Sequence, residues 1–314
     1  MANAPLKKII SFYVRFTASY SKIGYYARRL FWRRLRGDYH GQTWVVVGGS
    51  EGIGGATVRA AVAGGARVVV IARDAQKMQD FLHTLRGPGQ AVAEVADFSR
   101  MQQVWACLER LQAQSLKADV LVNNVGIQKR DQILTPEGLE TSFATNILSH
   151  YLLTREMLAR GMLTPDATVI EVSSGGMYNH PLVVQDLNIT GEGYLGVRAY
   201  GLSKRAQVML TQYWRETQVG ARRFYVMHPG WVDTAAVGRS MPRFRAMLKS
   251  VLRKHPMGAD TIVWLADRRP EQKSSESIWF DRKERTAHIF PRTRQTHDTP
   301  RTLVAFLESH SQPL

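Results

Sequence analysis

Short apolar runs rich in β-branched residues alternate along most of the chain with longer segments whose apolar residues recur every three or four positions. The runs predict strands over residues 44–47, 67–71, 91–95, 119–122, 167–172, 223–228 and 277–280. The intervening segments predict helices over residues 54–63, 74–85, 101–114, 139–160 and 199–217. Uninterrupted apolar strands are typical of a parallel sheet that is buried on both faces. The alternation therefore predicts an α/β fold, a doubly wound parallel sheet with helices on both sides.

The first forty residues follow a different pattern, in which one helical stripe is apolar and the cations lie largely off it. The members of this stripe are Ile9, Phe12, Tyr13, Phe16, Tyr20, Ile23, Ala27 and Leu30. The extension holds nine Lys and Arg residues against one acid, Asp38, and so accounts for +8 of the net charge of +16. Its apolar runs are shorter than the roughly 18–20 residues that span a bilayer.

Three interpretations of this extension stay open. Residues 1–36 could lie as a basic amphipathic helix on an anionic membrane surface. They could be an Arg-rich transit segment for an organelle such as the mitochondrion. They could also pack on their own domain or on a partner subunit, as in a homo-oligomer. We expect an intracellular protein that is membrane-associated or organellar.

Composition narrows the class of protein. The chain has 314 residues, of which 44% are apolar and 22% charged, as is typical of a globular protein. We expect one domain over residues 41–285, after the extension at 1–40, and a tail over 286–314 with a short helix at 301–308. The single cysteine, Cys107, excludes an intrachain disulfide and a cysteine-rich zinc site, and we expect no metal. The basic chain carries no recognised nucleic-acid-binding motif, so we expect no nucleic-acid partner.

A glycine-rich turn follows the first predicted strand and precedes a helix. Its residues are Gly48, Gly49, Ser50, Glu51, Gly52, Ile53 and Gly54. Glycines at 48, 52 and 54 permit a tight turn, a close approach of backbone amides to a pyrophosphate, and close packing of helix on strand. The start of the helix adds partial positive charge toward the phosphates. The turn predicts a dinucleotide-binding (Rossmann) fold.

The end of the second strand bears on the choice between NADP(H) and NAD(H). An acid there would favour NAD(H) through the ribose hydroxyls, but the strand is followed by Arg73, which is placed to meet a 2′-phosphate. Asp74 is a competing candidate for NAD(H) and also a candidate helix N-cap. Glu51 would oppose a phosphate nearby. The residues favour NADP(H).

Tyr200 and Lys204 are four residues apart on a predicted helix and therefore share one face. A free phenol holds its proton up to pH about 10, and a nearby ammonium group would lower that pKa. Tyr200 is therefore a candidate general acid and base.

These features occur in a fixed order with other short motifs. In sequence they are the glycine turn, Asp97, Asn123-Asn124-Val125-Gly126, Asn146, Ser173-Ser174, Tyr200-x-x-x-Lys204 and Pro229-Gly230. In this order the chain resembles the short-chain dehydrogenase/reductase family over residues 41–234. Segments 173–177, 228–231, 258–261 and 280–283, together with the N-terminal extension, resemble the family's dehydrogenase/reductase member 12 branch.

The resemblance implies a role for each matching residue. Ser174 would bind the substrate oxygen, Tyr200 would protonate it, Lys204 would bind the nicotinamide ribose, and Asn146 would hold a water in the proton relay. Contacts to the cofactor would come from Gly48, Ser50, Glu51, Gly52, Ile53, Gly54, Arg73, Asp97, Phe98, Asn124, Val125, Gly126, Tyr200, Lys204, Pro229, Gly230, Val232 and Thr234. Two residues depart from the family pattern: Val47 stands in place of threonine and Val125 in place of alanine.

Two functions are consistent with these residues. The first is an NADP(H)-dependent oxidoreductase acting on a small-molecule carbonyl or alcohol. Its substrate side would include Met177, Tyr178, His180, Leu182, Trp231 and Phe244, which indicates a lipophilic substrate. The second is a non-catalytic, membrane-associated scaffold or regulatory protein that binds NADP(H). The presence of all four reacting residues favours the enzyme.

Overall fold

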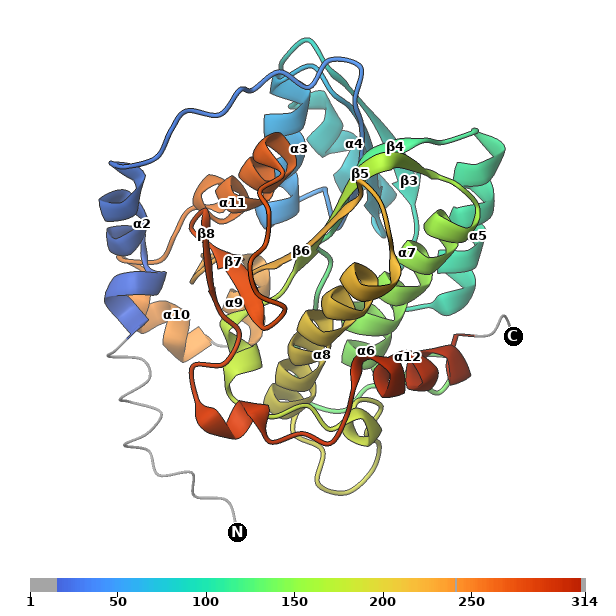
Figure 1. Ribbon diagram of the computed structural model, residues 1–314, viewed down its shortest axis with the longest axis vertical. Helices are drawn as coiled ribbons and strands as arrows, with labels where there is room; N and C mark the ends of the chain where they lie inside the picture. The colour runs from blue at the N-terminus through green and yellow to red at the C-terminus, as the bar shows by residue number, and fades with distance from the viewer. Residues whose placement is uncertain (1–15, 241, 312–314) are drawn as a thin grey trace.

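The computed structural model describes residues 16–240 and 242–311, and within them eight strands form one sheet in the order β3-β2-β1-β4-β5-β6-β7-β8 (Figure 1). The strands are β1 Thr43–Val47, β2 Arg67–Ala72, β3 Gln90–Val95, β4 Ala118–Asn123, β5 Leu163–Val172, β6 Arg223–Met227, β7 Ser277–Phe280 and β8 Lys283–Thr286. All pairs are parallel except β7 with β8. The predicted doubly wound α/β fold is confirmed.

Helices cover both faces of this sheet. The helices are α2 Lys22–Arg29, α3 Gly52–Ala63, α4 Ala75–His83, α5 Met101–Ala113, α6 Thr141–Phe143, α7 Ser149–Ala159, α8 Gly196–Thr217, α9 Ala235–Ser240, α10 Pro242–Leu248, α11 His255–Arg268 and α12 Pro300–Ser309. Figure 1 shows α3 and α11 on one side of the sheet and α5, α7 and α8 on the other. Helix α11 was not predicted from the sequence.

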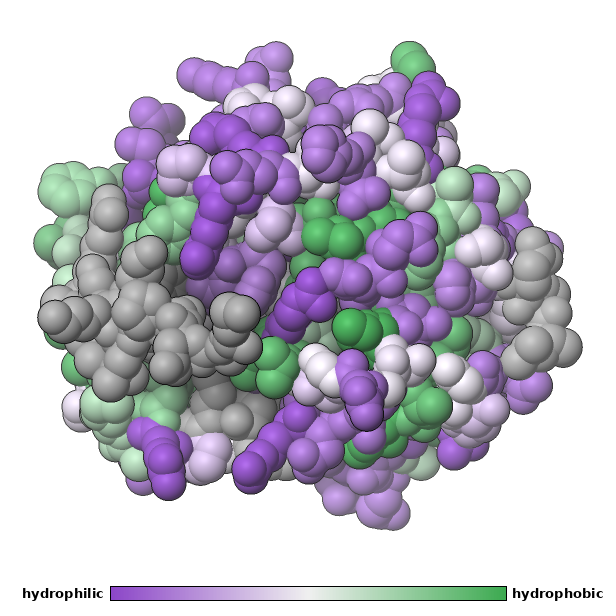
Figure 2. Space-filling model, turned by 90° about the horizontal axis from the view of Figure 1, so that it is seen from below, coloured by the Kyte–Doolittle hydropathy of each residue, from purple (hydrophilic) through white to green (hydrophobic). Residues whose placement is uncertain are grey.

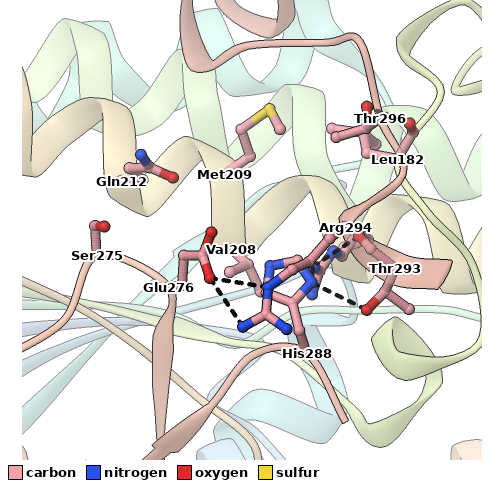
Figure 3. Close-up of a pocket in the computed structure, with 11 residues that line it drawn as sticks. Leu182, Val208, Met209, Gln212, Ser275, Glu276, His288, Thr293, Arg294 and Thr296 are labelled. Carbon is pink, nitrogen blue, oxygen red and sulfur yellow. Dashed lines mark hydrogen bonds and ion pairs between the residues drawn. The ribbon is translucent and has the colours of Figure 1, made fainter. Parts of the chain in front are cut away.

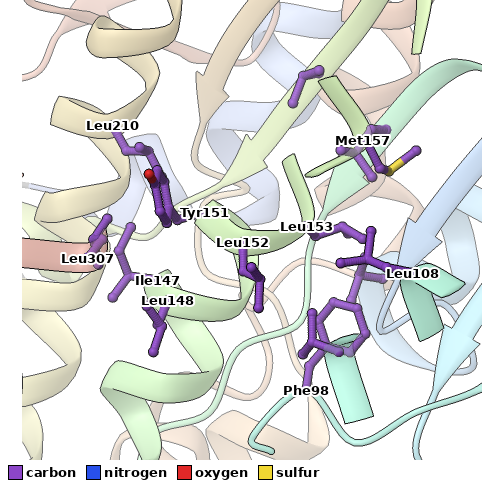
Figure 4. Close-up of a cluster of buried hydrophobic side chains, with 14 of the residues drawn as sticks. Phe98, Leu108, Ile147, Leu148, Tyr151, Leu152, Leu153, Met157, Leu210 and Leu307 are labelled. Atoms are coloured by element: carbon purple, nitrogen blue, oxygen red, sulfur yellow. The ribbon is translucent and has the colours of Figure 1, made fainter. Parts of the chain in front are cut away.

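Side chains along β1 point alternately to the two faces of the sheet and join a different apolar cluster on each face. Val45 and Val47 join the larger apolar cluster with α5, α7, α8 and α12, whereas Trp44 and Val46 join the cluster beneath α3 and α11. Figure 4 shows the larger cluster, in which Tyr151 and Leu152 of α7 lie among residues of neighbouring helices such as Leu210. Both faces of the strand are therefore buried, which is why it reads as an unbroken apolar run.

The chain after β7 forms a further strand that the sequence did not predict. Strands β7 and β8 form a hairpin whose turn residues, Asp281 and Arg282, both have positive φ angles of 50° and 57°. Strand β8 lies at the edge of the sheet and is largely exposed, so its sequence carries no apolar signal. The predicted C-terminal helix is present as α12, which buries Leu303 and Leu307 against α8 and its neighbours.

The N-terminal extension, of which residues 16–40 are described, packs on its own domain rather than standing apart. Its predicted apolar stripe is only partly buried. Tyr20 is 4% exposed, but Ile23 is 55% and Leu30 82% exposed, while Tyr25 faces the protein instead. The reason is that Ser21 interrupts the helix and caps a new one, α2, which shifts the buried face. The predicted stripe residues Ile9, Phe12 and Tyr13 lie outside the described residues.

Candidate active site

The glycine turn between β1 and α3 has the shape that its sequence predicts. Gly48 and Gly52 have φ angles of +71° and +59°, and a Cβ atom on Gly54 would lie 2.2 Å from the carbonyl oxygen of Gly48. Asn124, at the end of β4, donates from Nδ2 to the carbonyl oxygens of Val47 (3.2 Å) and Gly48 (3.1 Å). Only glycine fits this cradle, and its geometry suits a bound pyrophosphate.

The end of β2 presents cations beside the turn. Arg73 is exposed directly after the strand, and Asp74 caps α4 by accepting a hydrogen bond from the backbone of Lys77 at 2.9 Å. The side chain of Lys77 also pairs with Glu51, with Nζ 2.5 Å from Oε2. Asp74 therefore acts as an N-cap, and the charge of Glu51 is balanced by Lys77, which the sequence analysis did not single out.

Two other predicted cofactor residues lie at the end of β3. Asp97 is half-buried and accepts hydrogen bonds through Oδ1 from the backbone and the hydroxyl of Ser99 at 3.0 and 2.8 Å. The side chain of Phe98 is only 3% exposed and belongs to the larger apolar cluster. Phe98 can therefore reach a cofactor only through its backbone.

Ser174, Tyr200 and Lys204 lie together at one end of the sheet. Ser174 follows β5, and its side chain interacts with that of Tyr200, which lies in the first turns of α8. Lys204, one turn further along, donates from Nζ to the carbonyl oxygen of Val172 at 2.9 Å, and Nζ lies 5.8 Å from the centroid of the Tyr200 ring. A Cβ on Gly176 would lie 3.3 Å from the same ring, so a glycine there lets the loop after β5 approach the phenol.

The pKa of Tyr200 departs from the prediction. Burial raises the pKa of this phenol above its usual range, and the hydrogen bond from Ser174 opposes that rise only in part. The expectation that Lys204 makes the phenol acidic is therefore wrong for this structure, because the lysine ammonium is directed to the carbonyl of Val172. Burial lowers the pKa of Lys204 to about 8, and the carboxylate of Glu171 works against that fall.

Asn146 sits on a π-helical turn, Ala144–Leu148, that interrupts the single helix predicted over 139–160. Its Oδ1 accepts from the backbone of Ile127 at 2.8 Å, and its Nδ2 donates to the carbonyl of Ile127 (2.9 Å) and to the hydroxyl of Ser203 (3.0 Å). A Cβ on Gly126 would lie 3.0 Å from Nζ of Lys204 and 3.5 Å from Oδ1 of Asn146. The fold therefore brings Gly126, Asn146 and Lys204 together.

A buried polar network beneath this site was missed by the sequence analysis. Glu171 on β5 accepts from Asn123 at 2.6 Å and lies 2.8 Å from the ring of His150, which also contacts the carbonyl of Val125 at 3.0 Å. Gln207 of α8 lies 3.1 Å from His150. Glu171 interrupts the apolar run of residues 169–172 at the end of β5, and that interruption is the signal that could have identified it.

The segment after β6 completes the site. Val232 is buried and contacts the start of α3 by way of Gly258, whose Cβ would lie 2.7 Å from Val232 and 3.1 Å from Ile53. Thr234 lies 3.9 Å from the Cβ position of Gly52. Gly230, with φ +77°, faces the side chain of Arg253.

A cavity of about 120 Å³ lies on another side of α8, away from these residues (Figure 3). It is lined by Leu182, Arg205, Val208, Met209, Gln212, Ser275, Glu276, His288, Thr293, Arg294 and Thr296. Small-molecule sites usually have volumes of roughly 300–1,000 Å³, so this cavity is too small for a dinucleotide.

Within residues 16–240 and 242–311, no helix is both long and apolar enough to cross a bilayer. The same residues hold no group of three or more His, Cys, Asp or Glu side chains arranged for a metal ion.

Comparison with known proteins places this arrangement in a family. The family model described as short chain dehydrogenase matches residues 42–243. The chain is 34% identical over 273 residues to dehydrogenase/reductase SDR family member 12 of Bos taurus, covering 85% of this chain and 86% of that protein. It is 32% identical over 260 residues to a protein of Streptomyces named as a daunorubicin C-13 ketoreductase, covering 79% and 85% of the two chains.

Solved structures share the fold. An uncharacterized protein from Mycobacterium Paratuberculosis superimposes with a TM-score of 0.68 at 24% identity, over 87% of this chain and 94% of that one. The RhlG/NADP active-site complex of Pseudomonas aeruginosa superimposes with a TM-score of 0.61 at 24% identity, over 76% and 93% of the two chains. The fold, the order of the motifs and the relatives agree. The chain belongs to the short-chain dehydrogenase/reductase family and is an NAD(P)-dependent oxidoreductase.

Proposed function

We propose that the protein reduces a lipophilic ketone or aldehyde with NADPH, and that Ser174, Tyr200, Lys204 and Asn146 carry the reaction. One observation supports this most strongly. Ser174 and Tyr200 interact at the same end of the sheet as the glycine cradle, with Lys204 and Asn146 beside them. An unrelated use of the fold would not require these four polar groups to converge.

The chemistry divides between the cofactor and the side chains. The nicotinamide, when bound, supplies the hydride. Ser174 orients the substrate oxygen, and Tyr200 gives that oxygen its proton. The raised pKa of Tyr200 keeps the phenol protonated at neutral pH, which suits the direction of reduction. Lys204, with a pKa of about 8, is still largely cationic at neutral pH and can bind the ribose hydroxyls.

The preference for NADP(H) rests on the end of β2. Arg73 is exposed and available to a 2′-phosphate, Lys77 balances the charge of Glu51, and Asp74 is engaged as a helix cap. NADP is also present in the solved RhlG complex and in the angucycline C-6 ketoreductase LanV, which is compatible with this preference.

A lipophilic substrate is supported by different residues from those first expected. Met177 and Tyr178 are fully buried, so they support the loop after β5 from within. The exposed apolar residues nearby are Val183 and Leu195 of the following loop and Val197 in the first turn of α8. This loop lies at the lower end of the molecule in Figure 1, and Figure 2 shows hydrophobic residues between hydrophilic ones on that face. Relatives named for daunorubicin and for retinol are consistent with a large apolar substrate.

Two measurements test the proposed function. Titration with NADPH and NADH, followed by tryptophan fluorescence, should show tighter binding of NADPH, and Arg73→Ala should weaken NADPH roughly tenfold and leave NADH unchanged. A panel of ketones and aldehydes should then give NADPH oxidation at 340 nm. Binding of NADPH without oxidation of any compound would favour the alternative, a non-catalytic NADP(H)-binding scaffold.

We also propose that the outward face of α2 contacts an anionic membrane surface. Ile23 and Tyr26 of α2 are 55% and 49% exposed, and Leu30 and Phe31, directly after the helix, are 82% and 87% exposed. Exposed arginines flank them, and residues 16–37 include no acid. Such a face suits the headgroup region of a bilayer. Leu30→Ser with Phe31→Ser should reduce co-sedimentation with anionic vesicles, and equal binding to neutral vesicles would contradict the proposal.

A further inference from the structure

We infer that Tyr20 of the N-terminal segment is a positioning residue of the active site. It holds two loops in place, residues 173–178 after β5 and residues 228–233 after β6. These loops flank the proposed catalytic centre, because the first contains Ser174 and the second contains Pro229 and Gly230. The inference rests on the proposed function and extends it to a part of the chain outside the family match at residues 42–243.

The ring of Tyr20 lies between the two loops. A Cβ on Gly175, the residue after Ser174, would lie 3.6 Å from Cε2 of Tyr20. The ring centroid is 4.7 Å from that of His228 and 5.8 Å from that of Trp231, with both pairs edge to face. The side chains of Tyr20 and Tyr178 also interact, and the Tyr178 hydroxyl donates to the carbonyl of Thr286 at 3.1 Å. One buried side chain therefore touches both loops.

The backbone of the segment is paired with the second loop as well. The amide of Trp231 donates to the carbonyl of Tyr20 at 2.9 Å, and the amide of Arg253 donates to the carbonyl of Trp231 at 2.8 Å. On the other side of the same stretch, the amide of Lys22 donates to the carbonyl of Val251 at 2.9 Å. Backbone hydrogen bonds therefore connect three stretches of chain: the N-terminal segment, the second loop and residues 251–253.

The buried ion pair between Arg253 and Asp281 stabilises these backbone contacts. The guanidinium of Arg253 is fully buried and donates to the carbonyls of Tyr20 (2.8 Å) and Pro229 (3.1 Å). It also binds both oxygens of Asp281 at 2.6 and 2.8 Å. Arg28 of α2 binds the same carboxylate, with Nε 2.7 Å from Oδ2. Asp281 therefore joins α2, the second loop and the β7–β8 turn.

The neighbouring turn residue holds the segment further along. Arg282 binds Asp260 of α11 through two contacts of 2.7 Å, and its guanidinium lies 4.5 Å from the ring of Trp32. Tyr25 donates to the same Asp260 at 3.3 Å. The inward face of α2 is thus fixed to the domain while its outward face stays exposed, so the proposed membrane-contacting helix and the active-site loops form one packed unit.

Three variants test the inference. Tyr20→Ala removes the ring, Tyr20→Phe keeps the ring and removes only the hydroxyl, and Tyr213→Ala is the control. Tyr213 is a partly buried aromatic residue on α8, thirteen positions after Tyr200 and so about 20 Å along the helix. Its loss should lower thermal stability without moving either loop.

The first measurement is steady-state reduction of the carbonyl compound that the wild-type protein reduces best. Displacement of a reacting group by about 1 Å can cost roughly 100-fold in rate. We expect Tyr20→Ala to lower kcat/KM by about 10- to 100-fold, mainly through kcat, with the affinity for NADPH changed less than about threefold. Tyr20→Phe should recover most of the loss, and Tyr213→Ala should keep the wild-type kcat.

The second measurement is amide hydrogen exchange, which needs no substrate. Tyr20→Ala should speed exchange in residues 173–178 and 228–233 beyond the change seen in Tyr213→Ala. Unchanged exchange in both loops, or a kcat equal to that of the control, would overturn the inference. If the wild-type protein reduced no compound, the proposed function would fail while the exchange comparison would still decide the role of Tyr20.

Discussion

Burial determines the charge states of the two groups that the sequence identified most clearly, Tyr200 and Lys204. The four-residue spacing predicted their shared helix face, and the structure places them together near Ser174. The spacing could not predict the raised pKa of the phenol, because desolvation depends on residues brought in from other elements. Glu171, whose carboxylate raises the pKa of Lys204, lies on β5 and is not part of the Tyr-x-x-x-Lys motif, so the motif could not predict its effect.

The pKa of Lys204 leads to a prediction for cofactor binding. Lys204 is cationic below pH about 8 and loses its charge above it, so the affinity for NADPH should fall as pH rises through about 8. Glu171→Gln removes the carboxylate that raises this pKa, and the fall should then begin at lower pH. Fluorescence titrations between pH about 6 and 10 measure both curves. Identical curves for the two proteins would contradict the role given to Glu171.

His228 leads to a prediction for stability. Burial first, and then the charges of Arg253 and Arg28, lower its pKa to about 3 from an ordinary value of 6.5. Between pH 6.5 and 3 the unfolded chain therefore binds a proton that the folded protein does not, so stability falls as pH falls through this window. His228→Phe keeps a ring against Phe280 and should show a shallower loss of melting temperature below pH 6.5. Parallel curves for the two proteins would be the contrary result.

At the scale of elements, seven strands were predicted, including the edge strand β3, and within the described residues only the edge strand β8 was missed. Residues 44–47 of β1, 68–72 of β2 and 120–122 of β4 form apolar runs because both faces of these strands are covered. Strand β8 is polar because it is exposed, and the π turn at Asn146 leaves no periodic signal within an apolar helix. The β7–β8 hairpin was not predicted, and its turn contains Asp281, which binds Arg28 of the N-terminal segment. This contact could therefore not be predicted from the sequence.

Asp281→Asn tests how strongly this hairpin holds the segment. Asparagine tolerates the positive φ angle of 50° at this turn position, so the backbone should be little strained. The substitution leaves Arg253 buried with its positive charge unpaired, which typically costs about 3–5 kcal/mol. Urea unfolding measures the loss. The matched control is Asp166→Asn, which removes a more exposed pair with Arg269 and should cost less than about 1 kcal/mol. Equal losses for the two variants would contradict the account.

At the scale of the whole molecule, the sequence predicted the doubly wound fold and the family, but the way the N-terminal extension packs on the domain could be seen only in the structure. The extension's charge was visible, but its buried face depends on the break at Ser21 and on partners more than 200 positions away. With Tyr20 turned inward and Phe31 outward, the same segment contacts both the active-site loops and solvent.

The charge of the molecule leads to a prediction for membrane contact. Exposed charges are screened over about 8 Å at physiological ionic strength and over about 3 Å at 1 M salt. Co-sedimentation with anionic vesicles should therefore weaken as salt is raised, while the residual binding should depend on Leu30 and Phe31. Binding that is insensitive to both salt and these two residues would exclude the proposed face.

Transfer of deuterium from NADPH labelled at C4 to the reduced product tests the proposed reaction most directly. With the preferred carbonyl compound of the panel, the wild-type protein should place the label on the carbon of the new alcohol. Tyr200→Phe should bind NADPH with nearly unchanged affinity and yield almost no labelled product, because the substrate oxygen then lacks its proton donor. Labelled product formed equally by both proteins, or by neither at saturating NADPH, would contradict a reduction that depends on Tyr200.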